Sequence, residues 1–417
     1  AWDFAVASRA HVIGGILSMR EQALAAVAGG VTYSITNVND APANPAVARI
    51  VEGTFDVPSF LDDDEEIERS ADGTAVMQGV RSFPFTMLIP RSVVTAGVPA
   101  PLLVYGHGVF GNSRADLQSA FGDEVLTPIA EDTGAIIIAT DFIGLSFADQ
   151  ELIITRVVTD VNNLHVVTDR LEQSVINNLV LIELAQIELA DDPALQTTAG
   201  ARLVNDEVRY YGISLGGITG VAVVALSRDI DRAVLALPGG SWSTILPRSV
   251  VYGPIKGLFD SFYPDPIFQQ TFMAMLQARF DGSDGINLGQ LYLRNPLPDA
   301  PPDRRILLIE GVGDCKVPNL TAHMLSRAMG LDLVTPSYAP VFGLTEVSAP
   351  SDRGAIAQVA LPDRLATFTP ADENVVPTTD NLVHNNTVDL PTVHAQTVAL
   401  LRDGQVTQSC SGACDPD

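Results

Sequence analysis

The pentapeptide Gly-Ile-Ser-Leu-Gly at residues 212–216 contains the side chain with the clearest potential for chemistry, Ser214. A β-rich run at 207–211 leads directly into it, and a predicted helix begins near Leu215. A strand-to-helix turn tight enough to lift a serine clear of a sheet leaves no room for side chains two residues to either side, which explains the two glycines. Such a pentapeptide arises by chance in roughly one chain in ten, so its position between strand and helix carries the inference. We predict that Ser214 is a nucleophile that attacks an acyl carbon.

A serine that attacks a carbonyl group needs hydrogen-bond donors for the negative charge that develops on the carbonyl oxygen. The predicted helix points its free amides and the positive end of its dipole at Ser214, so the Leu215 amide is one expected donor. The second donor should come from the glycine-rich loop Gly106–Gly111, which follows another predicted strand. We expect the Val109 amide in this role, with the Phe110 amide as the alternative.

Serine is a weak nucleophile until a histidine accepts its proton and an acid orients that histidine. Asp314 lies just past a predicted strand end and is the expected acid, with Glu310 in reserve. His384 and His394 both lie late enough in the chain to be the base. Pro391 suits the first turn of a helix, which puts His394 inside that helix and His384 in the preceding loop. His384 is therefore the preferred base and His394 the alternative.

The loop Gly106–Gly111 also has the spacing Gly-x-Gly-x-x-Gly, and Asp141 ends the next predicted strand. This combination is typical of a dinucleotide-binding fingerprint, so an oxidoreductase is an alternative of a different class. The loop continues with Asn-Ser-Arg, where the fingerprint requires a helix already under way. His107 lies in the same loop and precedes Ser214, so we expect it to support the loop and not to act as the base.

Short β-branched runs alternate with helical patterns from residue 83 onward, which predicts parallel strands joined by helices. A helix is expected at 8–28 behind a Ser8 cap, and a long helix at 160–190 with a one-sided apolar stripe. The alternation of strand and helix patterns stops at 239–303. This segment is rich in aromatic residues and methionine, which predicts a helical insertion. The predicted strands are Phe83–Ile89, Pro101–Tyr105, Ala135–Thr140, Glu207–Tyr211, Arg232–Leu237 and Arg305–Glu310, with a further β-like run at Ala355–Leu361.

The Gly-His-Gly loop, the Gly-Ile-Ser-Leu-Gly turn, a Gly-Asp-x-x-Val-Pro loop and a late histidine follow one another over about residues 83–404. Together they resemble a bacterial esterase or lipase of the α/β-hydrolase superfamily. The resemblance implies a mostly parallel, eight-stranded α/β sheet flanked by helices and no cofactor. It also implies a catalytic triad of Ser214, His384 and Asp314, with Leu215 and Val109 as the oxyanion donors.

This resemblance suggests how the chain is organised. Residues 1–82 would form an N-terminal extension of a helix and strands packed on the core, and 83–238 with 304–404 the α/β-hydrolase core. Residues 239–303 would form a cap or lid inserted between strands six and seven, and 405–417 a C-terminal tail.

The expected reaction is hydrolysis of a carboxylic ester with hydrophobic parts, including lipids and polyesters, through an acyl-enzyme. Phe110, Phe142 and Trp242 are expected to line the substrate pocket beneath the insertion. An acyltransferase would use the same residues, and a non-catalytic binding relative would keep the fold without reacting covalently. No metal site is indicated.

The net charge of −26 and the absence of clustered Lys and Arg argue against nucleic acid as a partner. No apolar run reaches the roughly 18 to 20 residues of a membrane-spanning helix. Cys410 and Cys414 lie in a polar Gly/Ser tail, where an oxidised pair would tie down the chain end, and this favours a secreted or periplasmic protein. Cys315 is expected to be a buried thiol. The acidic run 61–66 lacks the ligand spacing of a calcium loop and is expected to be solvated.

Overall fold

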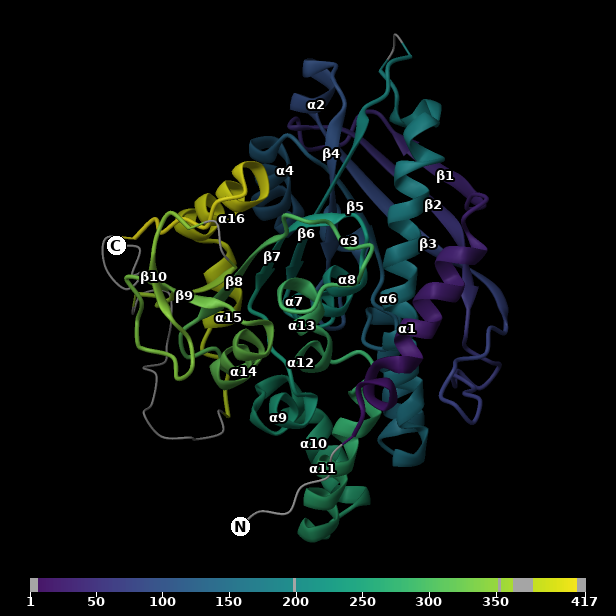
Figure 1. Ribbon diagram of the computed structural model, residues 1–417, viewed down its shortest axis with the longest axis vertical. Coiled ribbons are helices and arrows are strands. Elements are labelled where there is room, and N and C mark those ends of the chain that lie inside the picture. Colours follow the sequence, from purple (N-terminus) through teal and green to yellow (C-terminus); the bar gives the residue numbers. More distant parts are fainter. Residues whose placement is uncertain (1–6, 198–199, 352–353, 363–377, 411–417) are drawn as a thin grey trace.

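The computed structural model describes residues 7–197, 200–351, 354–362 and 378–410. Within these ranges, eleven strands join into a single sheet (Figure 1). The strands are β1 (Tyr33–Asn39), β2 (Val47–Ser59), β3 (Gly79–Pro90), β4 (Ala100–Gly106), β5 (Ile136–Thr140), β6 (Val204–Ile213), β7 (Ile230–Ala236), β8 (Arg305–Gly311), β9 (Asp332–Thr335), β10 (Glu346–Ser348) and β11 (Ala355–Val359).

The strand order across the sheet is β1-β2-β3-β5-β4-β6-β7-β8-β11-β9-β10. Neighbouring strands from β5 to β10 run parallel. The pairings β1–β2, β2–β3 and β3–β5 at the other side are antiparallel. The predicted α/β class with a mostly parallel sheet is therefore confirmed, and all six strands predicted from β-branched runs are present.

The expectation of eight strands is wrong, because strands join the sheet at both sides. β1 and β2 come from residues 1–82, which we expected to pack on the core as an extension, and β2 pairs with β3 from Val47 to Ser59. β1 lies at the edge and exposes most of its side chains, so its sequence lacks a clear apolar alternation. At the opposite side, β9 and β10 have only four and three residues, too few for a periodic pattern.

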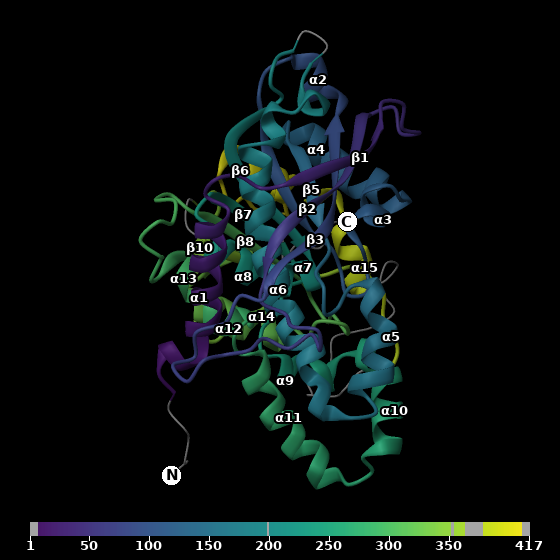
Figure 2. The ribbon, with the colours of Figure 1, turned by 90° about the vertical axis from the view of Figure 1, so that its right-hand side faces the viewer.

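Helices cover both faces of the sheet (Figures 1 and 2). Those in the described ranges are α1 (Arg9–Ala26), α2 (Arg91–Ala96), α3 (Ser113–Leu117), α4 (Thr127–Thr133), α5 (Gln150–Leu152), α6 (His165–Gln186), α7 (Leu215–Ile218), α8 (Gly220–Leu226), α9 (Trp242–Ile245), α10 (Gly253–Phe262), α11 (Pro266–Phe280), α12 (Gly285–Leu288), α13 (Gln290–Leu293), α14 (Asn319–Met329), α15 (Val383–Val388) and α16 (Pro391–Asp403).

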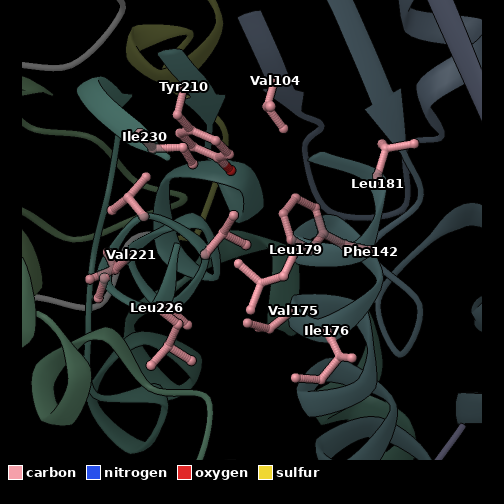
Figure 3. Close-up of a cluster of buried hydrophobic side chains, with 14 of the residues drawn as sticks. Val104, Phe142, Val175, Ile176, Leu179, Leu181, Tyr210, Val221, Leu226 and Ile230 are labelled. Atoms are coloured by element: carbon pink, nitrogen blue, oxygen red, sulfur yellow. The ribbon is translucent and has the colours of Figure 1, made fainter. Parts of the chain in front are cut away.

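The sheet separates two hydrophobic cores. Successive side chains of a strand point to opposite faces, and in β4 Leu102 and Val104 enter one core while Leu103 and Tyr105 enter the other. The first core packs against α1, α6 and α8, and the second against α4 and α16. Figure 3 shows part of the first core, where side chains of α6 and α8 meet those of the strands.

The apolar stripe of α6 is buried in the first core, as expected, and nearly all other sides of the helix are buried as well. Helix α1 and the chain around Phe60 cover its outer face, where polar side chains are buried with hydrogen-bond partners. Gln173 accepts from Phe60 N at 2.9 Å and donates to Asn177 Oδ1 at 3.0 Å. Polar residues in the sequence therefore concealed a second buried face.

The segment between β7 and β8 is helical, as its composition predicts. Its longest helices, α10 and α11, form a hairpin that extends from one end of the molecule (Figures 1 and 2). In the part of the chain that the structure describes, no helix is long and apolar enough to cross a bilayer. Cys315 is a free, buried thiol and Cys410 is disulfide-bonded, whereas Cys414 lies outside the described residues.

The acidic run at 61–66 is held by arginine side chains. Glu65 forms ion pairs with Arg81 and Arg170, and Arg81 also donates to the carbonyl oxygens of Leu61 and Asp62. Glu65 thus ties the run to α6, whereas Asp63, Asp64 and Glu66 are exposed, as expected of a solvated loop.

Candidate active site

Ser214 lies at the sharp turn between β6 and α7. Its backbone has φ 57° and ψ −114°, a conformation that non-glycine residues adopt only at a cost of about 1–3 kcal/mol. Three backbone hydrogen bonds hold it there: Ser214 N donates to Ala236 O at 3.0 Å, and Ser214 O accepts from the amides of Gly217 and Ile218 at 2.8 and 2.9 Å. The turn therefore fixes the side chain above the carboxyl end of the sheet.

Glycines allow the backbone to pack tightly around this turn. A Cβ atom on Gly212 would collide with the carbonyl group of Gly216, and a Cβ atom on Gly216 would collide with the carbonyl group of Gly106. Tyr210 Oη donates to Gly216 O at 2.7 Å and buttresses the turn from below. These contacts explain why residues 212 and 216 are glycines, as the sequence indicated.

Two backbone amides next to Ser214 are available to a ligand. Among the described residues, neither Leu215 N nor Val109 N donates to a protein acceptor. The Phe110 amide, which we considered as an alternative donor, donates to Leu145 O at 2.8 Å. Gly216 N donates to His107 O at 2.9 Å and so holds the glycine-rich loop against the turn.

His107 supports the glycine-rich loop from inside the protein, in keeping with the sequence interpretation. It is fully buried, and its Nε2 accepts from Phe142 N at 2.8 Å. The ring proton must then be on Nδ1, which lies 2.7 Å from Gly108 O. With both nitrogens engaged, this imidazole is not available as a base.

Asp314 and His384 form a buried pair. Asp314 Oδ2 lies 2.6 Å from His384 Nδ1, and their side chains are 1% and 9% exposed. The other carboxylate oxygen, Oδ1, accepts from the backbone amides of Lys316 and Val317 at 2.7 and 3.1 Å. These bonds orient the carboxylate, which in turn sets the imidazole tautomer with its proton on Nδ1 and an unprotonated Nε2.

We expected His384 in a loop, but it lies in the first turn of the short helix α15. The helix is joined to the acid loop by Lys316, whose Nζ donates to Asn385 Oδ1 at 2.8 Å and lies 3.0 Å from Asp380 Oδ2. Asn381 Nδ2 adds a bond to Gly313 O at 2.7 Å. We did not single out Lys316, Asn381 or Asn385 in the sequence, although Lys316 lies within the Gly-Asp-x-x-Val-Pro motif.

The other candidate bases and acids lie elsewhere. His394 is in α16, as predicted, and its Nε2 lies 2.7 Å from Asp132 Oδ2 in an exposed pair that does not line the main cavity. Glu310 accepts from Gln358 Nε2 at 2.7 Å and lies 2.9 Å from His323 Nε2. Glu310 therefore has a separate set of partners and does not contact His384.

Ser214 and His384 both line the main cavity, which has a volume of about 690 Å³. The two side chains share no hydrogen bond in this structure. Trp242 and Phe110 line the same cavity, as we expected of substrate-binding residues. Phe142 does not: its side chain is fully buried in the first core (Figure 3). Its ring lies edge-on to that of His107, with 5.5 Å between the ring centroids. The expectation for Phe142 is thus wrong, because the chain after β5 turns inward.

Asp141, the residue that suggested a dinucleotide site, is already engaged. Its Oδ1 accepts from both the backbone amide and the hydroxyl of Ser113, each at 2.8 Å. The helix after the glycine-rich loop, α3, begins only at Ser113 and spans five residues. Because the fingerprint requires a helix that starts inside the glycine motif, this loop does not match it.

Comparisons with known proteins give structural similarity at low sequence identity. No family model and no curated protein sequence matches the chain. Acetyl xylan esterase 1 from Thermoanaerobacterium sp. JW/SL YS485 is 14% identical, with 86% of this chain and 94% of that chain covered and a TM-score of 0.48. The acetyl xylan esterase from Paenibacillus sp. R4 is 14% identical, with 85% and 92% covered and a TM-score of 0.46. The rice cell wall degrading esterase LipA from Xanthomonas oryzae is 15% identical, with 89% and 97% covered and a TM-score of 0.39. At these values the similarity decides neither the reaction nor the substrate, and both must be argued from the site.

Proposed function

We propose that the protein is a serine hydrolase that cleaves carboxylic esters, with Ser214 as nucleophile, His384 as base and Asp314 as the orienting acid. The observation that carries this proposal is the buried Asp314–His384 pair, which opens onto the cavity that also contains Ser214. A nucleophile, an oriented base and two unused amide donors in one cavity are the parts that acyl transfer requires.

The first half of the reaction forms the acyl-enzyme. Ser214 Oγ attacks the ester carbon while His384 Nε2 takes the hydroxyl proton, and the carbonyl oxygen becomes an oxyanion bonded to the amides of Val109 and Leu215. As the carbon–oxygen bond to the alcohol breaks, the imidazolium returns that proton to the departing oxygen. Asp314 stays ionised throughout and stabilises the imidazolium.

In the second half, water takes the place of the alcohol. His384 Nε2 removes a proton from the water, the resulting hydroxide attacks the acyl carbon, and the Ser214 oxygen leaves with the proton from the imidazolium. The Ser214–His384 hydrogen bond is expected to form when substrate fills the cavity, because catalytic hydrogen bonds commonly tighten only in the complex.

Steady-state hydrolysis of nitrophenyl butyrate by three alanine variants tests these roles. Ser214→Ala and His384→Ala should each reduce kcat by about 10³-fold or more. His394→Ala is the matched control and should stay within about threefold, because its exposed partner Asp132 lies away from the cavity. An inactive His394 variant beside an active His384 variant would overturn the assignment of the base.

The disulfide at Cys410 supports the further proposal that the protein works in an oxidising compartment, outside the cell or in a periplasm. Localisation of the natural protein by cell fractionation tests this proposal, and recovery in the cytoplasm would contradict it.

A further inference from the structure

The main cavity has two ends of opposite character. At one end, six of its lining residues also line a second, smaller pocket of about 100 Å³, here called the side pocket. The shared residues are Phe110, Leu145, Trp242, Leu246, Tyr252 and Ile255. Beyond them the side pocket is enclosed by apolar side chains of α6 and α11, including Val167, Met273 and Leu276. The side pocket therefore adjoins the cavity across a boundary of apolar side chains.

The other end of the cavity is lined by three carboxylates, Asp116, Glu124 and Asp389, here called the acidic end. In the described part of the chain, none of the three forms an ion pair. One side-chain hydrogen bond reaches their carboxylate oxygens, from Tyr105 Oη to Asp116 Oδ2 at 2.9 Å. The nearby Lys316 is already bound to Asp380 and Asn385. The acidic end thus lacks a compensating cation of its own.

The pKa shifts of two of these carboxylates agree with the lack of a compensating cation. Burial raises the pKa of Asp116 above its ordinary value. Burial also raises the pKa of Asp389, and the neighbouring charge of Glu124 raises it further. Both shifts have the direction expected of carboxylates whose charge is poorly compensated, so a ligand that donates hydrogen bonds or carries positive charge would be favoured here.

The position of His384 decides which part of an ester lies at which end. The imidazole must reach the departing alcohol oxygen in order to protonate it, so the alcohol lies on the His384 side. Asn385, Val388 and Asp389 line the cavity on that side and belong to α15 or follow it directly. None of the residues around the side pocket belongs to α15. The acyl group therefore lies at the apolar end, next to the side pocket.

We propose that the site takes esters in which an apolar acyl chain, bound in the side pocket, is joined to an alcohol complementary to carboxylates, neutral and hydroxylated or cationic but not anionic. This inference rests on the proposed ester hydrolysis and names its substrate class. Anionic alcohols are disfavoured because they would be placed beside three negative charges without a compensating cation, of which Asp116 is half-buried and Glu124 and Asp389 are exposed. Longer acyl chains are favoured because each buried methylene improves binding about fourfold until the pocket is full.

The acyl side is tested by narrowing the side pocket. Met273→Trp places a larger side chain in the pocket, whereas Met275→Trp, two residues along α11, is the matched control, because Met275 is 67% exposed and lines neither cavity. With nitrophenyl esters, the ratio of octanoyl to acetyl kcat/KM should fall at least about tenfold in Met273→Trp and change less than about twofold in Met275→Trp. An unchanged ratio in Met273→Trp would overturn the acyl assignment, as would a change confined to the size of the alcohol.

The alcohol side is tested with butyrate esters of glycerol, choline and glycolate. Wild-type kcat/KM should be at least about tenfold lower for the anionic glycolate ester than for the other two. The double variant Glu124→Gln/Asp389→Asn should remove most of that difference, whereas the control Asp123→Asn/Glu151→Gln should leave it intact, because both control residues are exposed and lie outside the cavity lining.

Comparison of the neutral glycerol ester with the cationic choline ester separates the two sources of alcohol recognition. Preference for glycerol assigns it to hydrogen bonding, and preference for choline assigns it to charge. A preference for glycolate in the wild type would overturn the inference, as would a charge effect equal in the control variant. Failure of the proposed function is distinguishable, because the wild type would then hydrolyse none of the esters, acetyl esters included.

Discussion

Replacing Asp314 by asparagine should disable the base without unfolding the site. Asparagine has the same shape, but its Nδ2 donates where one carboxylate oxygen accepts. If Nδ2 faced the amides of Lys316 and Val317, two donors would oppose two N–H groups that now bond Oδ1 at 2.7 and 3.1 Å. Nδ2 should therefore turn to His384 and donate to its Nδ1. The imidazole proton is then forced onto Nε2, the nitrogen that must accept from Ser214.

The expected size of this effect follows from the loss of the correct tautomer. We expect kcat to fall by about 10⁴-fold, which corresponds to about 5.5 kcal/mol of transition-state stabilisation. KM should change little, because Asp314 does not line the cavity. Stability should fall by about 1–3 kcal/mol, since both amide hydrogen bonds are kept while the charge-assisted bond of 2.6 Å to His384 Nδ1 is replaced by a neutral one.

Steady-state kinetics on nitrophenyl butyrate, with thermal unfolding measured in parallel, checks this prediction. Asp380→Asn is the matched control, because Asp380 also contacts the acid loop through Lys316 but does not touch His384. Its kcat should remain within about threefold. The reasoning is refuted if Asp314→Asn is folded and retains kcat within tenfold of the wild type, or if Asp380→Asn is equally impaired.

Three further predictions concern packing, pH and redox state. Gly216→Ala should lower the free energy of unfolding by at least about 2 kcal/mol, because its Cβ would enter a neighbouring backbone carbonyl; Gly253→Ala, with open space around it, is the control for thermal unfolding. Burial raises the pKa of Glu172 from 4.5 to about 7, so the folded state binds this proton more tightly than the unfolded state does. The free energy of unfolding should therefore fall as the pH rises from about 4.5 to about 7, and Glu172→Gln should flatten that slope in denaturant titrations; an unchanged slope would contradict the assignment. Finally, alkylation of the denatured, unreduced protein should modify Cys315 and leave Cys410 unmodified, and mass spectrometry that finds Cys410 alkylated would refute the disulfide.

Local sequence was enough to predict features that depend on local sterics. Gly212 and Gly216 indicated a tight turn around Ser214, and the structure shows the backbone contacts that exclude side chains at both positions. The β-branched runs likewise located six central strands, because buried parallel strands are nearly continuous in apolar residues. The position of Asp314 past the end of β8 follows from the same pattern.

Features that depend on distant parts of the chain were not predictable in this way. His384 lies in a helix of six residues, too short for a periodic signal, and the loop residues Lys316 and Asn381 hold that helix in place. Phe142 was expected in the cavity, but the turn after β5 directs it into the core. The sequence of α6 indicated one apolar stripe, whereas α1 and the chain around Phe60 bury its polar face as well.

The acidic end of the cavity shows the same limit of local pattern. Asp116, Glu124 and Asp389 come from segments far apart in the sequence, and none belongs to a motif that indicates binding. Their common environment arises only when α3, the short helix Gly122–Leu126 and the end of α15 meet at one cavity wall.

Covalent labelling by a fluorophosphonate, followed by mass mapping of the labelled peptide, tests the central claim most directly. The reagent phosphonylates a serine that is activated by a base and placed beside oxyanion donors. The account predicts a single adduct on Ser214, absent from Ser214→Ala and formed far more slowly in His384→Ala. An adduct on another residue, or none on folded protein, would contradict it.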